Sequence, residues 1–252
     1  MRRAFVLLAA VVAATGCGGT HHYPTATAVA TVCGPLPAGL KTPAFWLKTS
    51  DGLRLYAAAA GQGPHAVVLV HESGGAGLCG WLPTMAWLAR NGFRAVALDL
   101  RGYPPSATPS TAAYHRYEPD LRAAVDAAHR LGSTTVTLMG ASMGGAAAIV
   151  EAPKLDGISG VVSLSDELNL PASGLDALAA APRVHVPLLV LASRDDGYLD
   201  GADAHRLVRA AGSADKTLHV YPGADHGWDL LALAPENTQV KATLLHWLRS
   251  RT

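Results

Sequence analysis

A candidate nucleophile stands in the pattern G-x-S-x-G, formed by G-A-S-M-G at residues 140–144. The pattern lies between an apolar run typical of a strand and a run typical of a helix, and a tight turn there lifts a serine above the end of a sheet. Glycine on both sides of the turn removes Cβ atoms that would clash. The pattern alone is a weak signal, but its position favours Ser142 as a nucleophile.

A serine hydroxyl needs a base to take its proton, and that base needs an acid to orient it. We favour His226 as the base, because it stands in a glycine-flanked loop after the last strand-like run, whereas His219 lies inside that run and is interpreted as structural. An earlier strand-like run, at residues 187–193, is followed by Asp195 and Asp196, and either could be the acid. Asp166, after a different run, is a further alternative.

Short apolar runs alternate with helical patterns from about residue 43 to the end of the chain. The predicted strands cover residues 45–49, 53–59, 66–71, 94–100, 134–139, 157–164, 187–193 and 217–221. The predicted helices cover residues 81–90, 118–131, 143–151, 202–211 and 235–249. Parallel strands need crossovers, which are usually helices, so this alternation predicts an α/β fold with an eight-stranded, mostly parallel sheet covered by helices on both faces.

We expect a single domain over residues 43–252, since 252 residues with half of them apolar suffice for one core. Sites in such sheets lie beyond the carboxyl ends of the strands, which is where the candidate residues stand. Only about 20 residues separate Asp166 from the next strand-like run at 187–193, too few for a large helical lid. An open site favours small or short-chain substrates.

The chain order Ser142, Asp196, His226 resembles that of α/β-hydrolase fold enzymes, and the resemblance runs from about residue 45 onward. It is carried by G-A-S-M-G, by P-L-L-V-L-A-S-R-D-D from residue 187 and by A-D-H-G-W from residue 224. The segment D-L-R-G-Y from Asp99 is similar to the family's D-x-R-G-x-G stretch. The second motif usually reads G-x-x-D in the family, with the last residue as the acid, so the resemblance favours Asp196 over Asp195.

The same resemblance implies an oxyanion hole, the pair of N–H groups that stabilises the tetrahedral intermediate. Its donors would be the N–H groups of Met143 and Ser73, the latter in a loop that reads H-E-S-G-G where many relatives have H-G-x-G. Glu72 replaces the usual glycine. This arrangement is similar to dienelactone-hydrolase-like enzymes, in which the matching glutamate lies near the nucleophile, although a glutamate turned to solvent or held by an arginine is an equal alternative.

These residues predict a serine esterase that forms an acyl-enzyme on Ser142 and needs no cofactor. Dienelactone-hydrolase-like cleavage and peptidase activity are alternatives within the class, because the triad does not record the leaving group. A non-catalytic, tethered binding protein is the alternative from another class. The histidines show no metal-ligand spacing, and we expect no metal. A net charge of +1 without long basic runs argues against nucleic acid as a partner, and the oligomeric state is left open.

The N-terminus has the pattern of a signal peptide over residues 1–16. Two arginines precede an apolar run at 4–14 that is too short to span a bilayer, and Thr15, Gly16 and Cys17 follow. This end resembles the lipobox of bacterial lipoproteins, which implies cleavage before Cys17 and a lipid on its thiol. We therefore expect an exported protein held on the outer side of the cell membrane, the alternative being a soluble secreted protein.

Residues 17–42 lack helical or strand periodicity, and we expect this segment to be a flexible spacer between the lipidated cysteine and the domain. With Cys17 set aside, Cys33 and Cys79 remain, an even number in an oxidising compartment. They could form one disulfide, the alternative being two separate thiols.

Overall fold

One eight-stranded sheet organises the computed structural model, which describes residues 23–233 and 236–251. The strands lie in the order β1-β2-β4-β3-β5-β6-β9-β10. β2 runs antiparallel to both of its neighbours, and every other neighbouring pair is parallel. The strands are β1 (Ala44–Lys48), β2 (Arg54–Ala60), β3 (His65–Val70), β4 (Arg94–Leu98), β5 (Thr135–Ala141), β6 (Gly160–Leu164), β9 (Leu188–Ser193) and β10 (Lys216–Tyr221).

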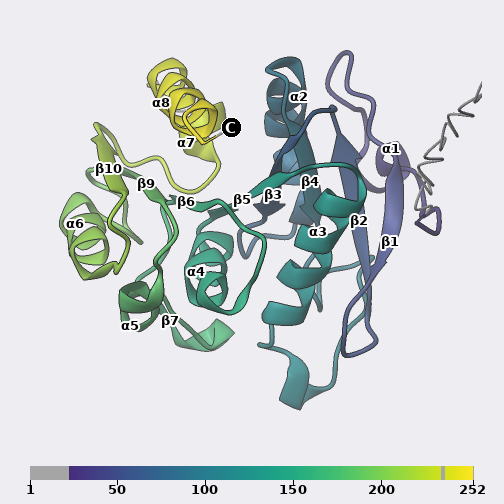
Figure 1. Cartoon of the computed structure of the whole chain (residues 1–252), viewed down its shortest axis with the longest axis horizontal. Helices are drawn as coiled ribbons and strands as arrows, with labels where there is room; N and C mark the ends of the chain where they lie inside the picture. The colour runs from purple at the N-terminus through teal and green to yellow at the C-terminus, as the bar shows by residue number, and fades with distance from the viewer. Residues whose placement is uncertain (1–22, 234–235, 252) are drawn as a thin grey trace, which may run out of the picture.

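Helices cover both faces of this sheet, and Figure 1 shows the two layers. Helices α3, α4, α5 and α6 pack on one face, while α1, α2, α7 and α8 pack on the other. The α-helices are α1 (Val29–Cys33), α2 (Leu82–Arg90), α3 (Glu118–Arg130), α4 (Met143–Glu151), α5 (Ala177–Ala180), α6 (Gly201–Ala210), α7 (Asp229–Ala232) and α8 (Asn237–Arg249), and the short 3-10 helix η1 (Gly77–Trp81) precedes α2.

The central strands are buried on both sides, which explains their unbroken apolar sequences. In β3, Val67 and Leu69 belong to the core under one helical layer, and Val68 and Val70 belong to the core under the other. None of these four side chains is exposed. Two separate cores therefore hold the middle of the sheet rigid beneath the loops that follow its strands.

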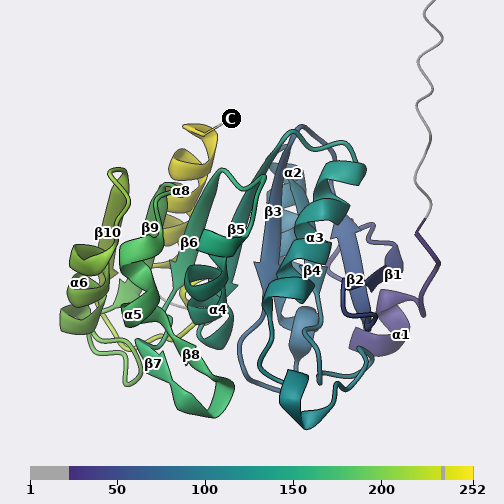
Figure 2. The same ribbon diagram turned by 60° about the horizontal axis from the view of Figure 1, so that its bottom comes forward.

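The predicted eight-stranded α/β fold is confirmed. The largest difference at the start of a strand is in β6, which begins at Gly160 instead of residue 157. Helix α8 begins at Asn237, and residues 234–235 lie outside the described part of the chain. The stretch without a predicted element after β6 holds a small hairpin of β7 (Asn169–Leu170) and β8 (Leu175–Asp176), followed by α5, next to α4 (Figure 2).

The prediction of a flexible spacer is wrong for residues 23–42. The Trp46 N–H donates to the Pro24 carbonyl over 2.9 Å, so this segment pairs with the free edge of β1. Helix α1 follows, and a disulfide joins Cys33 to Cys79. The partners of this segment, β1 and Cys79, lie far from it in the sequence, so the segment itself shows no hydrophobic periodicity. The ordered domain therefore begins by residue 23 and not at residue 43.

The predicted signal peptide, residues 1–16, and the predicted lipidation site, Cys17, lie outside the described residues. Among the residues that are described, no helix is both long and apolar enough to span a membrane.

Candidate active site

Ser142 lies in the tight turn between β5 and α4. Its backbone has φ 49° and ψ −120°, a conformation that residues other than glycine rarely adopt and that marks strain at functional turns. A Cβ on Gly144 would overlap the carbonyl of Val70 at the end of β3, and one on Gly140 would overlap the Gly144 carbonyl. Both glycines of the motif are thus required by close backbone approach.

Asp196 and His226 form a hydrogen-bonded pair beyond the ends of β9 and β10. The His226 Nδ1 atom lies 2.9 Å from Asp196 Oδ2 and 3.1 Å from Oδ1. A carboxylate can only accept, so Nδ1 carries the proton and Nε2 is left as an acceptor. Because β9 and β10 are parallel neighbours, the loops that follow them meet at the same edge of the sheet.

The charges of this pair shift both pKa values. Burial raises the pKa of Asp196, but hydrogen bonds from His226 and from the Tyr198 N–H outweigh burial and hold it below its ordinary value. Burial lowers the pKa of His226, but the hydrogen bond and charge of Asp196, with Glu72 and Glu167, raise it above its ordinary value. The lowered pKa of Asp196 favours its ionised form, and an ionised carboxylate at this position would stabilise a protonated imidazole on His226.

The other two candidate acids do not contact His226. The Asp195 side chain is exposed, and its backbone N–H donates to the Gly223 carbonyl over 2.9 Å. Asp166 is fully buried and accepts a hydrogen bond from Ser163 Oγ. Burial raises the pKa of Asp166 to about 7, so it is a partly neutral group beneath the site. Of the three acids, only Asp196 is positioned to orient the histidine.

The loop that carries His226 packs against the strand that carries the serine. A Cβ added to Gly227 would lie 3.6 Å from the Cβ of Ala141, the residue before Ser142. The same atom would overlap Glu72 Oε2. The structure thus brings the histidine loop, the serine turn and the loop after β3 into one place.

Glu72 points into this site and not into solvent. Burial raises its pKa, while the Trp228 N–H and the charge of His226 lower it by less. Its Oε2 atom is buried and has no hydrogen-bond partner among the described residues. A carboxylate that is partly buried therefore lies near the candidate base.

The residues of both predicted oxyanion donors contact the Tyr103 hydroxyl. Met143 is the first residue of α4, where backbone N–H groups have no acceptor within the helix, and Ser73 lies in the exposed loop after β3. The Tyr103 hydroxyl lies 3.4 Å from the Ser73 carbonyl oxygen and 3.6 Å from the Met143 sulfur. Tyr103 therefore links the loop after β3 to the first residue of α4.

A buried histidine that the sequence analysis did not single out holds the loop after β3. The His71 Nε2 atom accepts from the Leu100 N–H over 3.1 Å, so its Nδ1 donates to the Glu72 carbonyl over 2.7 Å. Burial lowers the pKa of His71 to about 4, and the ring is neutral. His71 thus fixes the position of the loop that carries the predicted oxyanion donor Ser73, a structural role that a search for catalytic histidines does not detect.

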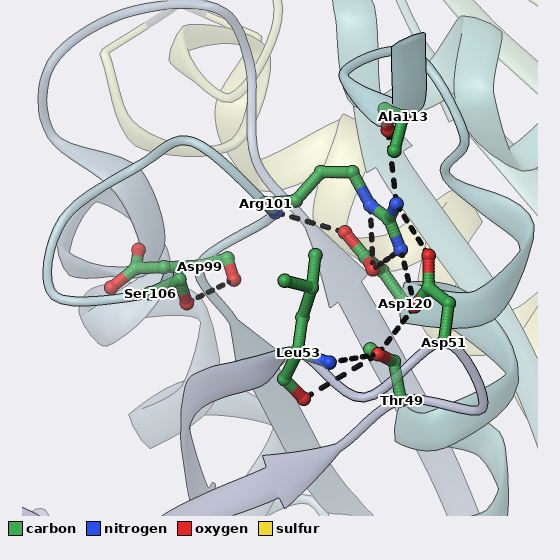
Figure 3. A network of polar contacts seen from close by, with 8 residues as sticks. All are labelled: Thr49, Asp51, Leu53, Asp99, Arg101, Ser106, Ala113 and Asp120. Atoms are coloured by element: carbon green, nitrogen blue, oxygen red, sulfur yellow. Dashed lines mark hydrogen bonds and ion pairs between the residues drawn. The ribbon is translucent and has the colours of Figure 1, made fainter. Parts of the chain in front are cut away.

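The D-L-R-G-Y segment is fixed by a buried ion-pair network (Figure 3). The Arg101 guanidinium donates to Asp120 Oδ1 from Nε and Nη2 over 3.0 and 2.7 Å, and to Asp51 Oδ2 from Nη1 over 2.9 Å. Ser106 Oγ donates to the Asp99 carbonyl over 2.6 Å. This network anchors the loop that presents Tyr103 to the site.

The disulfide supports the histidine loop from behind. Cys79 lies in η1, where a Cβ on Gly80 would overlap the ring of Trp228 and where Trp81 meets the same ring edge to face at 5.7 Å. Trp228 is two residues after His226. The disulfide between α1 and η1 therefore holds the segment that packs against Trp228, next to the candidate base in the sequence.

A cavity of about 560 Å³ lies next to the candidate base. The ring of Tyr198, which lines the cavity, is centred 4.5 Å from the His226 ring and is largely exposed. Most of the lining residues are polar or charged, among them Glu167, Asn169, Asp176, Asp203 and Arg206. The described residues include no cluster of three or more His, Cys, Asp or Glu side chains suited to a metal ion.

The order of the strands and the turn after β5 define the α/β-hydrolase fold, and solved structures share it. An esterase of Pyrococcus furiosus superposes with a TM-score of 0.71 at 16% identity, covering 92% of this chain and 99% of that one. An esterase of Exiguobacterium antarcticum superposes with a TM-score of 0.66 at 17% identity, covering 81% and 98%.

The family is identified by a match over most of the chain. The model of the dienelactone hydrolase family matches residues 54–250, and the chain belongs to that family. Serine hydrolase BPHL of Mus musculus is 34% identical over 106 residues, which are 41% of this chain and 36% of that protein. The matched part thus spans about a third of that relative.

Proposed function

We propose that this protein is a serine hydrolase that cleaves ester bonds of small or short-chain substrates through Ser142, His226 and Asp196. The observation that carries the proposal is the hydrogen-bonded pair of Asp196 and His226 in a loop packed against the strand that ends at Ser142. Family membership and esterases among the structural relatives support hydrolysis of esters.

In the proposed mechanism His226 Nε2 takes the Ser142 proton while the hydroxyl oxygen attacks the ester carbonyl. Asp196 stabilises the imidazolium that forms. The N–H groups of Met143 and Ser73 stabilise the oxyanion of the tetrahedral intermediate. His226 then gives its proton to the leaving alcohol, and a water molecule activated by the same histidine releases the acid from the acyl-enzyme.

Cleavage of a cyclic ester, as the family name suggests, is the second candidate. The inward carboxylate of Glu72 supports it, because dienelactone-hydrolase-like enzymes carry a matching glutamate near the nucleophile and because the charge of Glu72 helps to raise the pKa of His226. In this reading the acyl-enzyme chemistry is unchanged, and only the substrate differs.

The test of the proposed function is labelling with a fluorophosphonate probe, which reacts with activated serines. We expect the wild type to be labelled and Ser142→Ala to be unlabelled, with a matching loss of turnover on a series of p-nitrophenyl esters from acetate upward. A lactone series run in parallel separates the two candidate substrates. An unlabelled but correctly folded wild type would remove the hydrolase proposal.

We also propose that the protein is exported and carries a lipid on Cys17, which holds it on the outer side of the cell membrane. The signal-peptide pattern of residues 1–16 supports this localisation. Metabolic labelling with palmitate should mark the wild type and not Cys17→Ala. Equal label in both proteins would refute lipidation at this residue.

A further inference from the structure

A second cavity lies at the opposite end of the sheet from the candidate active site. It has a volume of about 700 Å³ and is formed where β2 ends, where β4 starts and where α2 and α3 end. Most of its lining is small or apolar, with Ala59, Ala60, Ala86, Ala89, Leu40, Pro43 and Leu131 among the residues. Because Ser142 and His226 follow the carboxyl ends of their strands, this groove is on the far side of the molecule from them.

The charges in this groove have one sign. Its lining includes Lys41, Arg90 and Arg94 and includes no aspartate or glutamate. None of the three forms an ion pair within the described part of the chain. We call the surface formed by these cations and the apolar lining the basic groove.

Arg94 is the most informative of these cations. Its Nε atom donates to Ser133 Oγ over 3.1 Å, which fixes the guanidinium and leaves both terminal nitrogens without a hydrogen-bond partner among the described residues. Its side chain is partly buried, and burial lowers its pKa. A desolvated guanidinium with a free pair of N–H groups is well suited to a phosphate, which accepts two parallel hydrogen bonds.

The positive charge exceeds what the protein itself offsets. Arg130, exposed at the end of α3, adds a fourth cation to the three in the groove. The C-termini of α2 and α3 carry about half a negative charge each, and Asp126, one turn before Arg130 in α3, also acts on Tyr23. About two positive charges remain for an external anion.

The start of the described chain lies beside this groove. Tyr23 lies close to Arg130, which directly precedes the groove residue Leu131. Tyr23 comes six positions after Cys17, and six residues of fully extended chain span at most about 20 Å. A lipid on Cys17 would therefore bring a bilayer within reach of the basic groove.

From this geometry we infer that the basic groove binds the phosphate headgroup of anionic phospholipids and rests on the membrane surface. The apolar lining accommodates the glycerol and upper acyl region, and Arg94 binds the phosphate with Lys41 and Arg90 around it. Docking in this orientation turns the candidate active site away from the bilayer, toward soluble substrates. The inference goes beyond the proposed hydrolase activity and does not depend on it.

The test is vesicle co-sedimentation of a protein comprising residues 18–252, which retains every described element and lacks the lipidated cysteine. Vesicles contain phosphatidylcholine with or without phosphatidylglycerol. We expect binding only when phosphatidylglycerol is present. Lys41→Gln/Arg90→Gln should weaken it by about 30-fold, since each basic residue at an anionic surface contributes about fivefold.

A matched control removes two cations elsewhere. Lys48 and Arg54 are exposed at the other end of β1 and β2, and Lys48→Gln/Arg54→Gln lowers the net charge equally. We expect this variant to bind within about threefold of the wild type. Hydrolysis of a soluble ester should be unchanged in both double variants, which shows that they are folded.

Several results would overturn the inference. Equal weakening of binding by both double variants would mean that only the net charge of the protein matters. Equal binding to vesicles with and without phosphatidylglycerol would show that the anionic headgroup is not recognised. Competition by potassium phosphate beyond that of potassium chloride at equal ionic strength would identify free phosphate as the occupant instead of a lipid. Vesicle binding is measured independently of hydrolysis, so a wild type without esterase activity would refute the proposed function and leave this inference standing.

Discussion

Replacing Asp196 with asparagine tests the pairing at the centre of the proposed site. The substitution keeps the size of the side chain and removes its charge. The amide nitrogen would donate toward His226 Nδ1, which shifts the ring proton to Nε2, the nitrogen that must accept from Ser142. The histidine would then be held in the wrong tautomer for a general base.

The expected loss can be estimated from the chemistry of such triads. Changing the acid to its amide lowers kcat by about 10⁴-fold in a Ser-His-Asp enzyme, which is about 5.4 kcal/mol in the activation free energy. The pKa of His226 should also fall, because the charge and hydrogen bond of Asp196 are the main influences that raise it against burial. The KM for a small ester should change little, since the Asp196 side chain is buried behind His226 and offers no surface to a substrate.

The assay is steady-state hydrolysis of p-nitrophenyl acetate by the wild type and by Asp196→Asn, with melting temperatures as a check on folding. Asp195→Asn is the matched control, because its side chain is exposed one position earlier. We expect the control to retain activity within about threefold. An equal loss in both variants, or near wild-type turnover by Asp196→Asn, would refute the assignment of the acid.

Three further predictions follow from the same structure. The acid limb of the pH profile of kcat/KM should have its midpoint above pH 6.5. The active base is neutral His226, and because its pKa is raised, the neutral form is lost at a higher pH as the solution is acidified. A midpoint below 6.5 in the pH–rate profile would contradict this prediction. Removing the Cys33–Cys79 disulfide with Cys33→Ser/Cys79→Ser should lower the free energy of unfolding by about 4 kcal/mol, as expected for a loop of this length. Denaturant titration measures this change, and an unchanged midpoint would show that the disulfide does not stabilise the fold. Arg101→Met should lower the free energy of unfolding by about 3–5 kcal/mol, because it leaves buried Asp120 without its cation. A melting temperature within a degree of that of the wild type would argue against a stabilising role of this network.

The layered fold could be predicted because it is recorded in local patterns. Runs such as V-V-L-V in β3 are apolar on both faces, and the helical repeats between them leave few alternatives to a parallel sheet. The segment at 23–42 could not be predicted, since it is ordered by single backbone contacts with β1 and by a disulfide to a residue 46 positions away. Contacts of that kind have no periodicity.

The candidate site was predictable in part. The positions of Ser142 and His226 after their strands were visible in the sequence, but the choice between Asp195 and Asp196 came from family resemblance and not from the residues. The inward position of Glu72 depends on a contact with Gly227 from the other end of the chain. The role of His71 depends on a backbone N–H that follows β4, which no local pattern could reveal.

The candidate base is carried by the loop after β10, and β10 is an edge strand with a single neighbour, β9. Of its six residues only Tyr221 is buried, so this border of the sheet should open at a lower free energy than the centre. Loss of the proposed hydrolytic activity should therefore report local unfolding of β10 and of the loop that follows it. On slow heating, turnover should disappear while the circular dichroism of the central sheet and its helices is still intact, and amide deuterium exchange should proceed fastest along β10.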